Sequence, residues 1–482
     1  MKKVKRARRP DSGGQARGVA LPLARAASPA GAPQVVGFVS LGCVKNLVDS
    51  EKMLGEIAES GAVVTGDESA ADTIVVNTCG FLGAARDEAL DVIRGLVARK
   101  ARGEIRRIVV AGCLVQRDGE SLRREIPEID ALVGVHNRAD VPQAVWGTRA
   151  LADRYLGEYH PQPWSDQGRL RLTPRHYAYV RISEGCDQKC TFCTIPAIRG
   201  PLHSKPPAQI VAECQEMIAD GARELVLIGQ DTTSYGVDIG YTGGLPELLR
   251  LLDKECHGAR WLRLMYVYPS IFTDEMIEAL AECPRVVKYI DIPLQHINDR
   301  MLRLMGRRVT RRETETLLEK LRRLMPGVTI RTTFIVGFPG ETDAEFEELV
   351  AFVREFGFDA VGAFKYSLEP ETPAARLPEH CDDALRTERY SRLMAAQQEV
   401  AFAAARRWVG REFEVVLDVV ERGRCFARHA GQAPDVDGVC LLPAGRRAPG
   451  EFIRVRCSDT AGYDLAVRET NRPGGPSGRE IG

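Results

Sequence analysis

Three cysteines follow an apolar stretch that has the pattern of a buried strand, and together they limit how the middle of this chain can fold. The stretch is 178–183, and the run is Cys186-Asp-Gln-Lys-Cys190-Thr-Phe-Cys193. A CxxxCxxC spacing suits three corners of a cubane iron–sulfur cluster and leaves the fourth iron open, whereas electron-carrier clusters are held by four cysteines. The run therefore indicates a cluster with one coordination site kept for a substrate or cosubstrate.

A zinc knuckle is the alternative interpretation of the same cysteines. His203 lies close enough along the chain to supply the fourth ligand of a tetrahedral zinc site. Zinc sites more often use paired CxxC spacings, which this run lacks, so the spacing favours the cluster. On the zinc interpretation, the protein is a non-catalytic adaptor that binds RNA or the ribosome.

Composition bounds the remaining possibilities. The chain has 482 residues, 44% of them hydrophobic, which is enough for two or three domains with cores of their own. Lys plus Arg and Asp plus Glu both number 66, so no overall positive field indicates nucleic acid as the partner. The 13 cysteines do not form a disulfide-dense pattern. We find no apolar signal region or membrane span, so a reducing cytoplasm and no membrane partner are expected.

The segment 35–140 alternates strand and helix patterns and predicts a parallel, Rossmann-like α/β domain. The expected strands are 35–41, 73–77 and 107–111, and the expected helices are 47–59 and 81–100. Regions of lower order flank this domain. We expect disordered tails at 1–34 and 473–482 and a proline-containing linker at 141–171.

A second group of cysteines falls at equivalent places in this domain. Cys43, Cys79 and Cys113 each come one or two residues after an expected strand, next to Gly42, Gly80 and Gly112. Parallel strands end at one edge of their sheet, and that edge is where open α/β folds bind ligands. A lone cysteine is usually a small buried hydrophobe, but three at equivalent strand ends favour a second cluster site. The remaining seven cysteines show no such equivalence and are interpreted as structural.

The segment 172–405 predicts a partial (β/α) barrel of the TIM type. Its expected strands are 178–183, 224–228, 262–267, 289–293, 329–336 and 359–366. Active sites of such barrels lie at the carboxyl ends of the strands, where the CxxxCxxC run also falls. Gln230 follows the second strand, and Gly337 and Glu341 follow the fifth. They are candidate cosubstrate contacts, although Glu341 also suits the first turn of a following helix.

The segment 406–472 changes character to short strands between Gly, Pro and Asp turns, which predicts a small OB-like β-barrel. The expected strands are 413–420, 438–442, 452–457 and 464–467. Residues 412–469 contain ten acids and eight arginines. A barrel that bound RNA through its phosphate groups would carry a clear excess of positive charge, so RNA is not the expected partner of this segment.

These motifs resemble those of a known enzyme family. With Phe192 before the third cysteine, the run matches the CxxxCxΦC signature of radical S-adenosylmethionine (SAM) enzymes. The order of a three-cysteine α/β domain, this barrel and a terminal unit that resembles a TRAM domain is similar to the radical SAM methylthiotransferases. The amino-terminal match lies in Ser40-Leu-Gly-Cys43-Val-Lys-Asn46, Asp49-Ser-Glu51, Asn77-Thr-Cys79 and Gly112-Cys113.

Within that family, the sequence resembles the branch that modifies an aspartate of protein twelve of the small ribosomal subunit. The supporting stretches are 41–46, 182–200, 230–236, 293–296 and 433–438. The alternative is the branch that modifies isopentenyladenosine in tRNA, which usually has Gln-Met-Asn where this chain has Val44-Lys-Asn46. Lys205 departs from the family's usual arginine and loses its bidentate fork, which leaves a carboxylate contact at that position in doubt.

The resemblance implies two 4Fe–4S clusters and two SAM molecules for each product. Cys43, Cys79 and Cys113 would hold an auxiliary cluster whose sulfur one SAM methylates. The cluster on Cys186, Cys190 and Cys193 would reductively cleave the second SAM to a 5′-deoxyadenosyl radical. That radical would take hydrogen from the aspartate β-carbon, which then collects the methylthio group. A generic radical SAM methyltransferase would leave the amino-terminal cysteines unexplained.

The resemblance also implies further contacts and partners. Gln230, Gly337 and Glu341 would contact SAM, and Phe192 would lie near its adenine. A flavodoxin or ferredoxin would supply the electrons. The substrate would be the ribosomal protein, possibly met within the ribosome, and the enzyme is expected to be a monomer.

Overall fold

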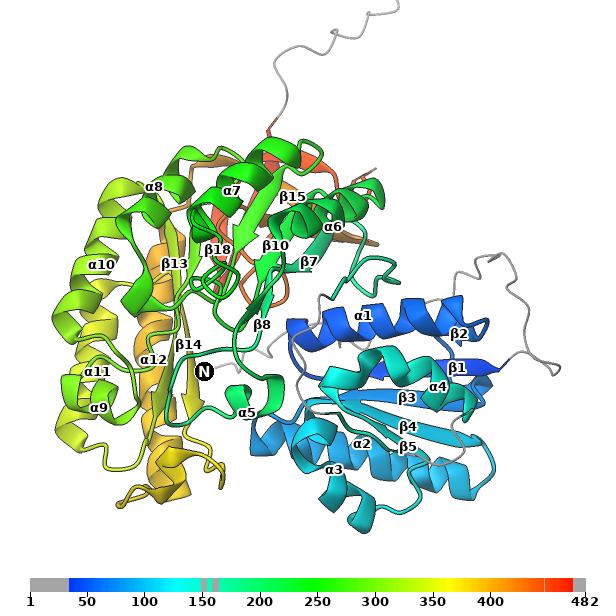
Figure 1. Ribbon diagram of the computed structural model, residues 1–482. Helices are drawn as coiled ribbons and strands as arrows, with labels where there is room; N and C mark the ends of the chain where they lie inside the picture. Colours follow the sequence, from blue (N-terminus) through cyan, green and yellow to red (C-terminus); the bar gives the residue numbers. More distant parts are fainter. Residues whose placement is uncertain (1–33, 149–153, 158–163, 446, 471–482) are drawn as a thin grey trace, which may run out of the picture. The chain divides into compact units, whose positions relative to one another are not determined.

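The computed structural model of the protein describes residues 34–148, 154–157, 164–445 and 447–470 (Figure 1). The chain forms two compact units. Unit 1 contains the described residues up to 157 together with 166–172 and 197–199, and unit 2 contains the remainder. The tails expected to be disordered lie outside the described residues, except for Gln34 at the end of the first tail, whose side chain hydrogen-bonds Thr73 in unit 1.

Unit 1 is built on a six-stranded parallel sheet. Its strands lie in the order β2-β1-β3-β4-β5-β6, with β1 (Val35–Ser40), β3 (Thr73–Thr78) and β4 (Arg107–Gly112) at the centre. This is the flavodoxin-like order, in which the chain direction across the sheet reverses between β1 and β3. The α/β domain predicted from the sequence is therefore confirmed, and its three expected strands are the central ones.

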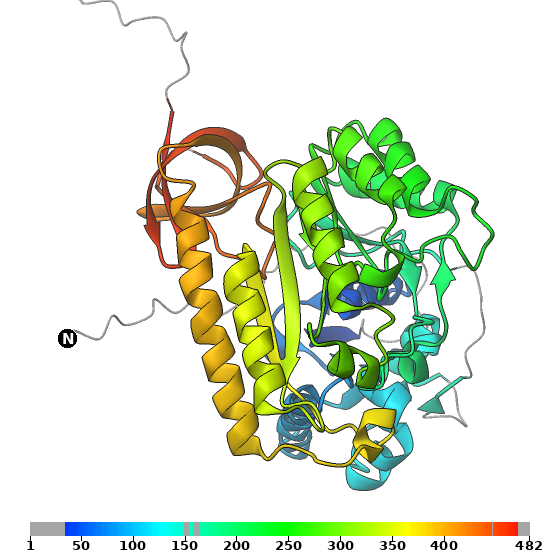
Figure 2. The ribbon, with the colours of Figure 1, turned by 90° about the vertical axis from the view of Figure 1, so that its left-hand side faces the viewer.

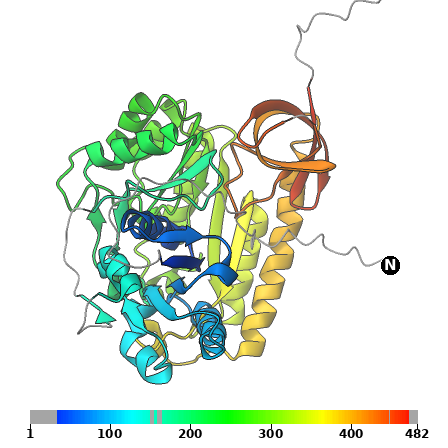
Figure 3. The same cartoon turned by 90° about the vertical axis from the view of Figure 1, so that its right-hand side faces the viewer.

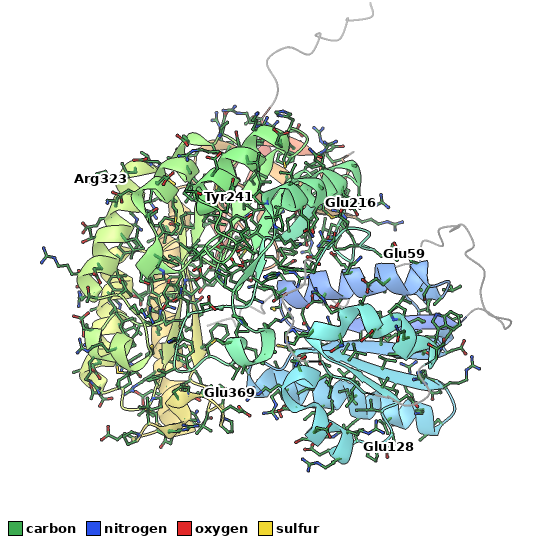
Figure 4. All side chains as sticks on the ribbon, in the orientation of Figure 1. Glu59, Glu128, Glu216, Tyr241, Arg323 and Glu369 are labelled. Atoms are coloured by element: carbon green, nitrogen blue, oxygen red, sulfur yellow. The ribbon has the colours of Figure 1, made fainter. Side chains whose placement is uncertain are left out.

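Helices cover both faces of this sheet (Figure 1). Helix α1 (Val44–Glu59) and helix α4 (Val141–Trp146) pack on one face over a core that contains Val36, Val75 and Val133. Helix α2 (Gly83–Ala101) and helix α3 (Cys113–Glu125) cover the opposite face. Exposed carboxylates such as Glu59 and Glu128 lie on the outside of unit 1 (Figure 4).

The structure adds elements to unit 1 that the sequence pattern did not reveal. Strand β2 (Val63–Thr65) and strand β5 (Ala131–Val133) are each three residues long. A segment of that length is too short to show the two-residue alternation of a strand in the sequence. The segment expected to be a linker begins instead with α4, whose Val141, Ala144 and Val145 are fully buried. It also contains β6 (Arg154–Tyr155), which pairs with β5. Part of that segment therefore belongs to the core of unit 1.

Unit 2 contains the open barrel. Its parallel strands are β7 (Tyr177–Arg181), β10 (Glu224–Ile228), β11 (Trp261–Leu264), β12 (Tyr289–Asp291), β13 (Thr329–Val336) and β14 (Ala360–Lys365). Two three-stranded sheets, β11-β10-β7 and β12-β13-β14, are joined through a parallel bridge between Leu262 and Val286. All six strands were expected from the sequence, with ends within three residues of those observed.

Helices surround the outside of this barrel, as Figure 2 shows. They are α6 (Pro207–Ala219), α7 (Gly244–Glu255), α8 (Asp274–Glu282), α10 (Arg311–Leu324), α11 (Asp343–Phe356) and α12 (Asp383–Arg406). Helices α10 and α11 each begin with a capping box, Thr310 with Glu313 and Thr342 with Glu345, which satisfies backbone donors that the first turn leaves free. The apolar faces of the helices meet the strands in one continuous core.

The carboxy-terminal part of unit 2 is a closed five-stranded barrel, visible in orange and red in Figure 3. Its strands are β15 (Glu412–Glu421), β16 (Arg424–His429), β17 (Cys440–Pro443), β18 (Phe452–Ala461) and β19 (Asp464–Glu469). The sequence pattern predicted four of these and missed β16. That strand carries Arg424, Arg428 and His429, so it has no simple alternation of apolar and polar residues.

The closed barrel packs against the amino ends of the open barrel's strands, and the arrowheads of β13 and β14 point away from it (Figure 2). A buried charge network joins the two. Glu224, at the start of β10, pairs with Arg263 of β11 at 2.7 Å and with Arg428 of β16 at 2.7 Å. The loop after β16 adds Asp437, which accepts a hydrogen bond from Tyr289 at 2.7 Å.

Among the described residues, none of the helices combines the length and the apolar character needed to cross a bilayer.

Candidate active site

The three amino-terminal cysteines lie where the sequence predicts, at the carboxyl ends of β1, β3 and β4. Cys43 caps the amino end of α1, Cys79 follows β3 directly, and Cys113 is the first residue of α3. The β1 and β3 ends flank the reversal point of the sheet, where folds of this type bind ligands. Helix amino termini favour the thiolate form of cysteine, so two of these positions suit metal ligation electrostatically.

Glycines allow the three cysteine loops to approach one another closely. A Cβ at Gly42 would lie 2.7 Å from the Cβ of Cys79, and one at Gly80 would lie 2.9 Å from the carbonyl carbon of Cys113. Gly112 has a φ of +98°, and a Cβ there would lie 2.2 Å from Oδ1 of Asn77. These contacts bring the three strand-end loops together at one edge of the sheet.

Burial acts on two thiols of this trio. It raises the pKa of Cys79, and it raises the pKa of Cys113 to about 12. The negative charge of Cys43 adds to the increase at both thiols, which reflects their proximity. Binding to iron requires thiolates, so cluster assembly at this edge must release protons that burial would otherwise retain.

Residues of the amino-terminal motif hold the loops in place. Asn46 donates hydrogen bonds to the carbonyl groups of Leu41 (2.8 Å) and Thr78 (3.0 Å), which ties the β1–α1 loop to the end of β3. Asn77 donates to the carbonyl of Asn46 and to the hydroxyl of Ser50, both at 2.8 Å. The asparagines of this motif therefore act on the backbone that carries the cysteines.

Arg199 also contacts this trio, although the sequence analysis gave it no role. Its guanidinium donates to Oδ1 of Asn46 at 2.9 Å and to the sulfur of Cys113 at 3.1 Å, and it forms an ion pair with Asp49 at 2.8 Å. The side chain is only 3% exposed. Arg199 stands six residues after Cys193 in the chain, within the Ile-Pro-Ala-Ile-Arg-Gly stretch that carried the family resemblance, and that stretch was the available signal.

The CxxxCxxC loop of unit 2 follows β7 and the two-residue strand β8 (Ser183–Glu184). Backbone hydrogen bonds fix it on several sides. Cys186 donates to the carbonyl of Gly200 at 3.2 Å, and Thr191 donates to the carbonyl of Met305 at 3.0 Å. Gly306 has a φ of +69°, and a Cβ there would lie 2.4 Å from the carbonyl oxygen of Lys189. The segment that ends helix α9 (Asp299–Leu304) therefore supports the cysteine loop.

The three cysteines of this loop are partly buried and close together. Burial raises the pKa of Cys186 and of Cys193 to about 12 each, and the charge of Cys190 adds to both increases. Arg307 lies beside them: its Nη1 is 3.6 Å from the sulfur of Cys190, and its guanidinium sits 4.0 Å from the ring centroid of Tyr268. Sequence reasoning missed both neighbours because they come from distant segments without a motif.

His203 does not join these cysteines in a zinc site. Its ring stacks near Trp164, with 5.1 Å between centroids, and its Nδ1 lies 3.8 Å from Asp238. In the described part of the chain, no group of three or more His, Cys, Asp or Glu side chains is arranged to hold a single metal ion.

Polar atoms without partners lie next to the CxxxCxxC loop. Gln230 follows β10, and its amide NH₂ donates to Glu184 while its Oε1 is buried without a hydrogen bond. The hydroxyl of Ser183, the first residue of β8, is likewise buried and unsatisfied. Buried polar atoms normally have partners, so these two fit an edge that a polar ligand completes.

The other expected cosubstrate contacts have neighbours of their own. Both oxygens of Glu341 are engaged: Oε1 lies 3.2 Å from His296, and Oε2 accepts from the backbone of Gly337 at 2.7 Å and from Arg389 at 2.6 Å. Phe192 packs edge-on against Phe338 with 6.5 Å between centroids. Glu341 therefore shapes the turn after β13, and its direct contact with SAM stays a prediction, as do those of Gly337 and Phe192.

Lys205, the departure from the family pattern, is completely buried. Its ammonium group pairs with Glu213 of α6 at 2.5 Å and lies 5.3 Å from the ring centroid of Trp164. A carboxylate partner is therefore kept at this position despite the loss of the guanidinium fork.

Comparisons with known proteins agree with this architecture. Residues 35–134 match the family described as uncharacterized protein family UPF0004, residues 180–353 match the radical SAM superfamily, and residues 409–468 match the TRAM domain. Together with the open barrel and its cysteine loop, these matches define a radical SAM enzyme with an additional α/β domain and a TRAM barrel.

Curated relatives narrow the class. The chain is 41% identical over 442 residues to the ribosomal protein uS12 methylthiotransferase RimO of Desulforamulus reducens, which covers 89% of this chain and 98% of that protein. It is 43% identical over 449 residues to the protein of the same name from Symbiobacterium thermophilum, with 92% of each chain covered. The chain belongs to the RimO family of ribosomal protein uS12 methylthiotransferases.

Solved structures share the fold at lower similarity. The radical SAM methyltransferase TsrM of Kitasatospora setae, with cobalamin and a [4Fe-4S] cluster bound, aligns with a TM-score of 0.53 at 18% identity. The alignment covers 71% of this chain and 77% of that one. The same enzyme with tryptophan and a SAM analogue bound also has a TM-score of 0.53, over 91% of this chain and 86% of that one at 16% identity.

Proposed function

We propose that this protein transfers a methylthio group to the β-carbon of an aspartate in ribosomal protein uS12 by radical SAM chemistry. The observation that carries the proposal is the membership of the RimO family over about nine tenths of the chain. The two cysteine trios, each at the carboxyl ends of parallel strands, support it independently. The non-basic TRAM barrel suits a basic ribosomal protein better than bare RNA.

The residues at the strand ends fit the cofactors that this reaction needs. Cys186, Cys190 and Cys193 would hold the 4Fe–4S cluster that binds SAM, with the unsatisfied Ser183 and Gln230 available to its polar groups. Cys43, Cys79 and Cys113 would hold the auxiliary cluster, at the reversal point of the unit 1 sheet. When bound, these groups supply the 5′-deoxyadenosyl radical and the sulfur that is transferred.

The chain's own residues prepare both sites. Cys113 is buried and Cys79, Cys186, Cys190 and Cys193 are partly buried, which limits the access of water to these ligands, whereas Cys43 is exposed. Arg307 fixes the CxxxCxxC loop from one side, because its Nη2 donates to the carbonyl of Pro293 at 2.6 Å while its Nη1 faces Cys190. The TRAM barrel occupies the amino ends of the strands, so the carboxyl ends stay available to substrate.

The partners follow from this chemistry. A flavodoxin or ferredoxin is the proposed electron source, since reductive cleavage of SAM needs a low-potential one-electron donor. The substrate is a ribosomal protein, so the proposed compartment is the cytoplasm. A monomer is the proposed state.

Mass spectrometry of two substrates tests the proposal. The anaerobically reconstituted protein, with SAM and dithionite, is incubated with purified uS12 and, separately, with tRNA that carries unmodified isopentenyladenosine. We expect a methylthio group on one aspartate of uS12 and none on the tRNA. The Cys190→Ala variant should give no product and no 5′-deoxyadenosine. Modification of the tRNA alone would overturn the assignment of the substrate.

A further inference from the structure

Arg199 occupies a position at the auxiliary trio that the proposed reaction has not yet used. It is buried within unit 1, and each of its terminal nitrogens has a defined partner there. Nη1 pairs with Asp49 at 2.8 Å, while Nη2 donates to Asn46 at 2.9 Å and to the sulfur of Cys113 at 3.1 Å. A charged side chain buried to this degree is costly unless its contacts offset the loss of water.

The contacts orient the guanidinium rather than merely neutralise it. Asp49 is 2% exposed and is shared, because its other carboxylate oxygen pairs with Arg138. One carboxylate therefore faces two guanidinium groups, and one of them, that of Arg199, also contacts the sulfur of Cys113. Asn46 accepts from the same nitrogen that faces the sulfur and also ties down the β1–α1 loop. Asn46 therefore links the position of the β1–α1 loop to the position of the Arg199 guanidinium.

We propose that Arg199 is a positioning residue of the auxiliary site, which orients Cys113 and raises the reduction potential of a cluster held on Cys43, Cys79 and Cys113. This inference rests on the proposed auxiliary cluster. Reduction adds negative charge to a cluster, so a fixed positive charge and a hydrogen bond to a ligand sulfur stabilise the reduced form. Arg307 has a comparable place at Cys190, with a longer nitrogen–sulfur distance of 3.6 Å.

The experiment isolates the auxiliary cluster in the full-length chain. In a background in which Cys186, Cys190 and Cys193 are all replaced by alanine, the protein is reconstituted and iron and sulfide are counted. The midpoint potential is then measured by redox titration with electron paramagnetic resonance. The variants are Arg199→Gln, Arg199→Lys and the matched control Arg138→Gln, which loses a partner of Asp49 but has no cysteine contact among the described hydrogen bonds.

The expected result is about four irons per chain in every variant. Arg199→Gln should lower the ratio of reduced to oxidised cluster about tenfold at a fixed potential, equivalent to a midpoint potential lower by about 59 mV for one electron. Arg199→Lys keeps the positive charge and should shift the midpoint potential less. The midpoint potential of Arg138→Gln should match that of the parent. Loss of iron from the Arg199 variants alone, with folding unchanged by circular dichroism, would also support the positioning role.

Other outcomes overturn the inference. Full iron with an unchanged potential in Arg199→Gln would show that the charge does not act on the cluster. Loss of iron together with loss of folded protein would assign Arg199 a structural role only. Equal shifts in Arg199→Gln and Arg138→Gln would mean that Asp49, not contact with Cys113, is responsible. A parent background that holds no iron would instead contradict the proposed auxiliary cluster itself.

Discussion

At the scale of single residues, the site depends on small side chains as much as on cysteines. Gly42, Gly80 and Gly112 stand directly before or after the auxiliary cysteines, and each leaves no room for a Cβ. Their positions next to the cysteines are visible in the sequence, but the reason for them is not. Each glycine lies against a different neighbouring loop in the folded structure, and a side chain would separate the two. The spacing of residues along the chain does not reveal which loops meet.

Substitution of Gly112 by alanine tests this requirement. The new Cβ would lie 2.2 Å from Oδ1 of Asn77 at a φ of +98°. We expect Gly112→Ala to lower the free energy of unfolding by about 2–3 kcal/mol and to reduce the iron content. Gly103 is the matched control, because its φ is +77° but nothing lies within 4 Å of its Cβ position. Gly103→Ala should cost about 1 kcal/mol and keep its iron; equal effects in urea titrations would contradict the account.

At the scale of elements, the sequence predicts strands well where both faces are buried. The central strands of unit 1 and β10 of the open barrel are largely apolar and were predicted. The other strands of the open barrel were predicted too, although β11 contains Arg263 and β13 contains Arg331. Strand β16 was missed for a physical reason: Arg428 pairs with Glu224 of the open barrel and His429 packs against Trp408 and Phe413, so the polarity of these two side chains hides the strand. Helix α4 was missed because Pro142 and the six-residue length read as a break in order, although Pro suits the first turn of a helix.

His429 gives the β16 element a measurable pH dependence. Burial, followed by the charges of Arg263 and Arg428, lowers the pKa of His429 to about 3 from 6.5. Above pH 6.5 the ring is neutral in both folded and unfolded chains. As the pH falls from 6.5 toward 3, the unfolded chain takes up a proton that the folded chain excludes, so stability is lost over that range.

The variant His429→Asn removes this titration and keeps an acceptor for the backbone of Gly431, which donates to Nδ1 at 2.9 Å. Between pH 7 and pH 5 the free energy of unfolding of wild type should fall by about 2 kcal/mol more than that of the variant. Urea titrations at the two pH values measure the difference. Parallel losses in both proteins would refute the assignment of His429.

At the scale of the whole molecule, the order of domains was predictable and their contacts were not. The TRAM charge count treated every acid as available to a partner. In the structure, Asp418 pairs with His176 and Arg428, Asp435 accepts from Tyr177, and Asp437 accepts from Tyr289. Without these acids and the buried Arg428, seven acids and seven arginines remain in 412–469. The barrel is therefore balanced rather than acidic, and still not basic.

Glu224 is the centre of the contact between the two barrels. Its carboxylate is fully buried between Arg263 and Arg428. Glu224→Gln removes the carboxylate that pairs with the buried Arg263, while Arg428 keeps its pair with Asp418, so we expect a loss of about 3–5 kcal/mol. Trp261, whose ring lies 4.9 Å from that of Phe452, gives a fluorescence signal at this contact. Glu414→Gln breaks the exposed pair with Arg260 and should cost under about 1 kcal/mol; similar costs for both variants would disprove the central role.

The proposed function depends on two separate cysteine trios that each hold a cubane cluster. The iron content of the anaerobically reconstituted full-length protein tests this most directly. We predict about eight irons per chain for wild type. Replacing all three cysteines of either trio by alanine should leave about four. A wild-type value near four, or a value that does not change when Cys43, Cys79 and Cys113 are replaced, would contradict it.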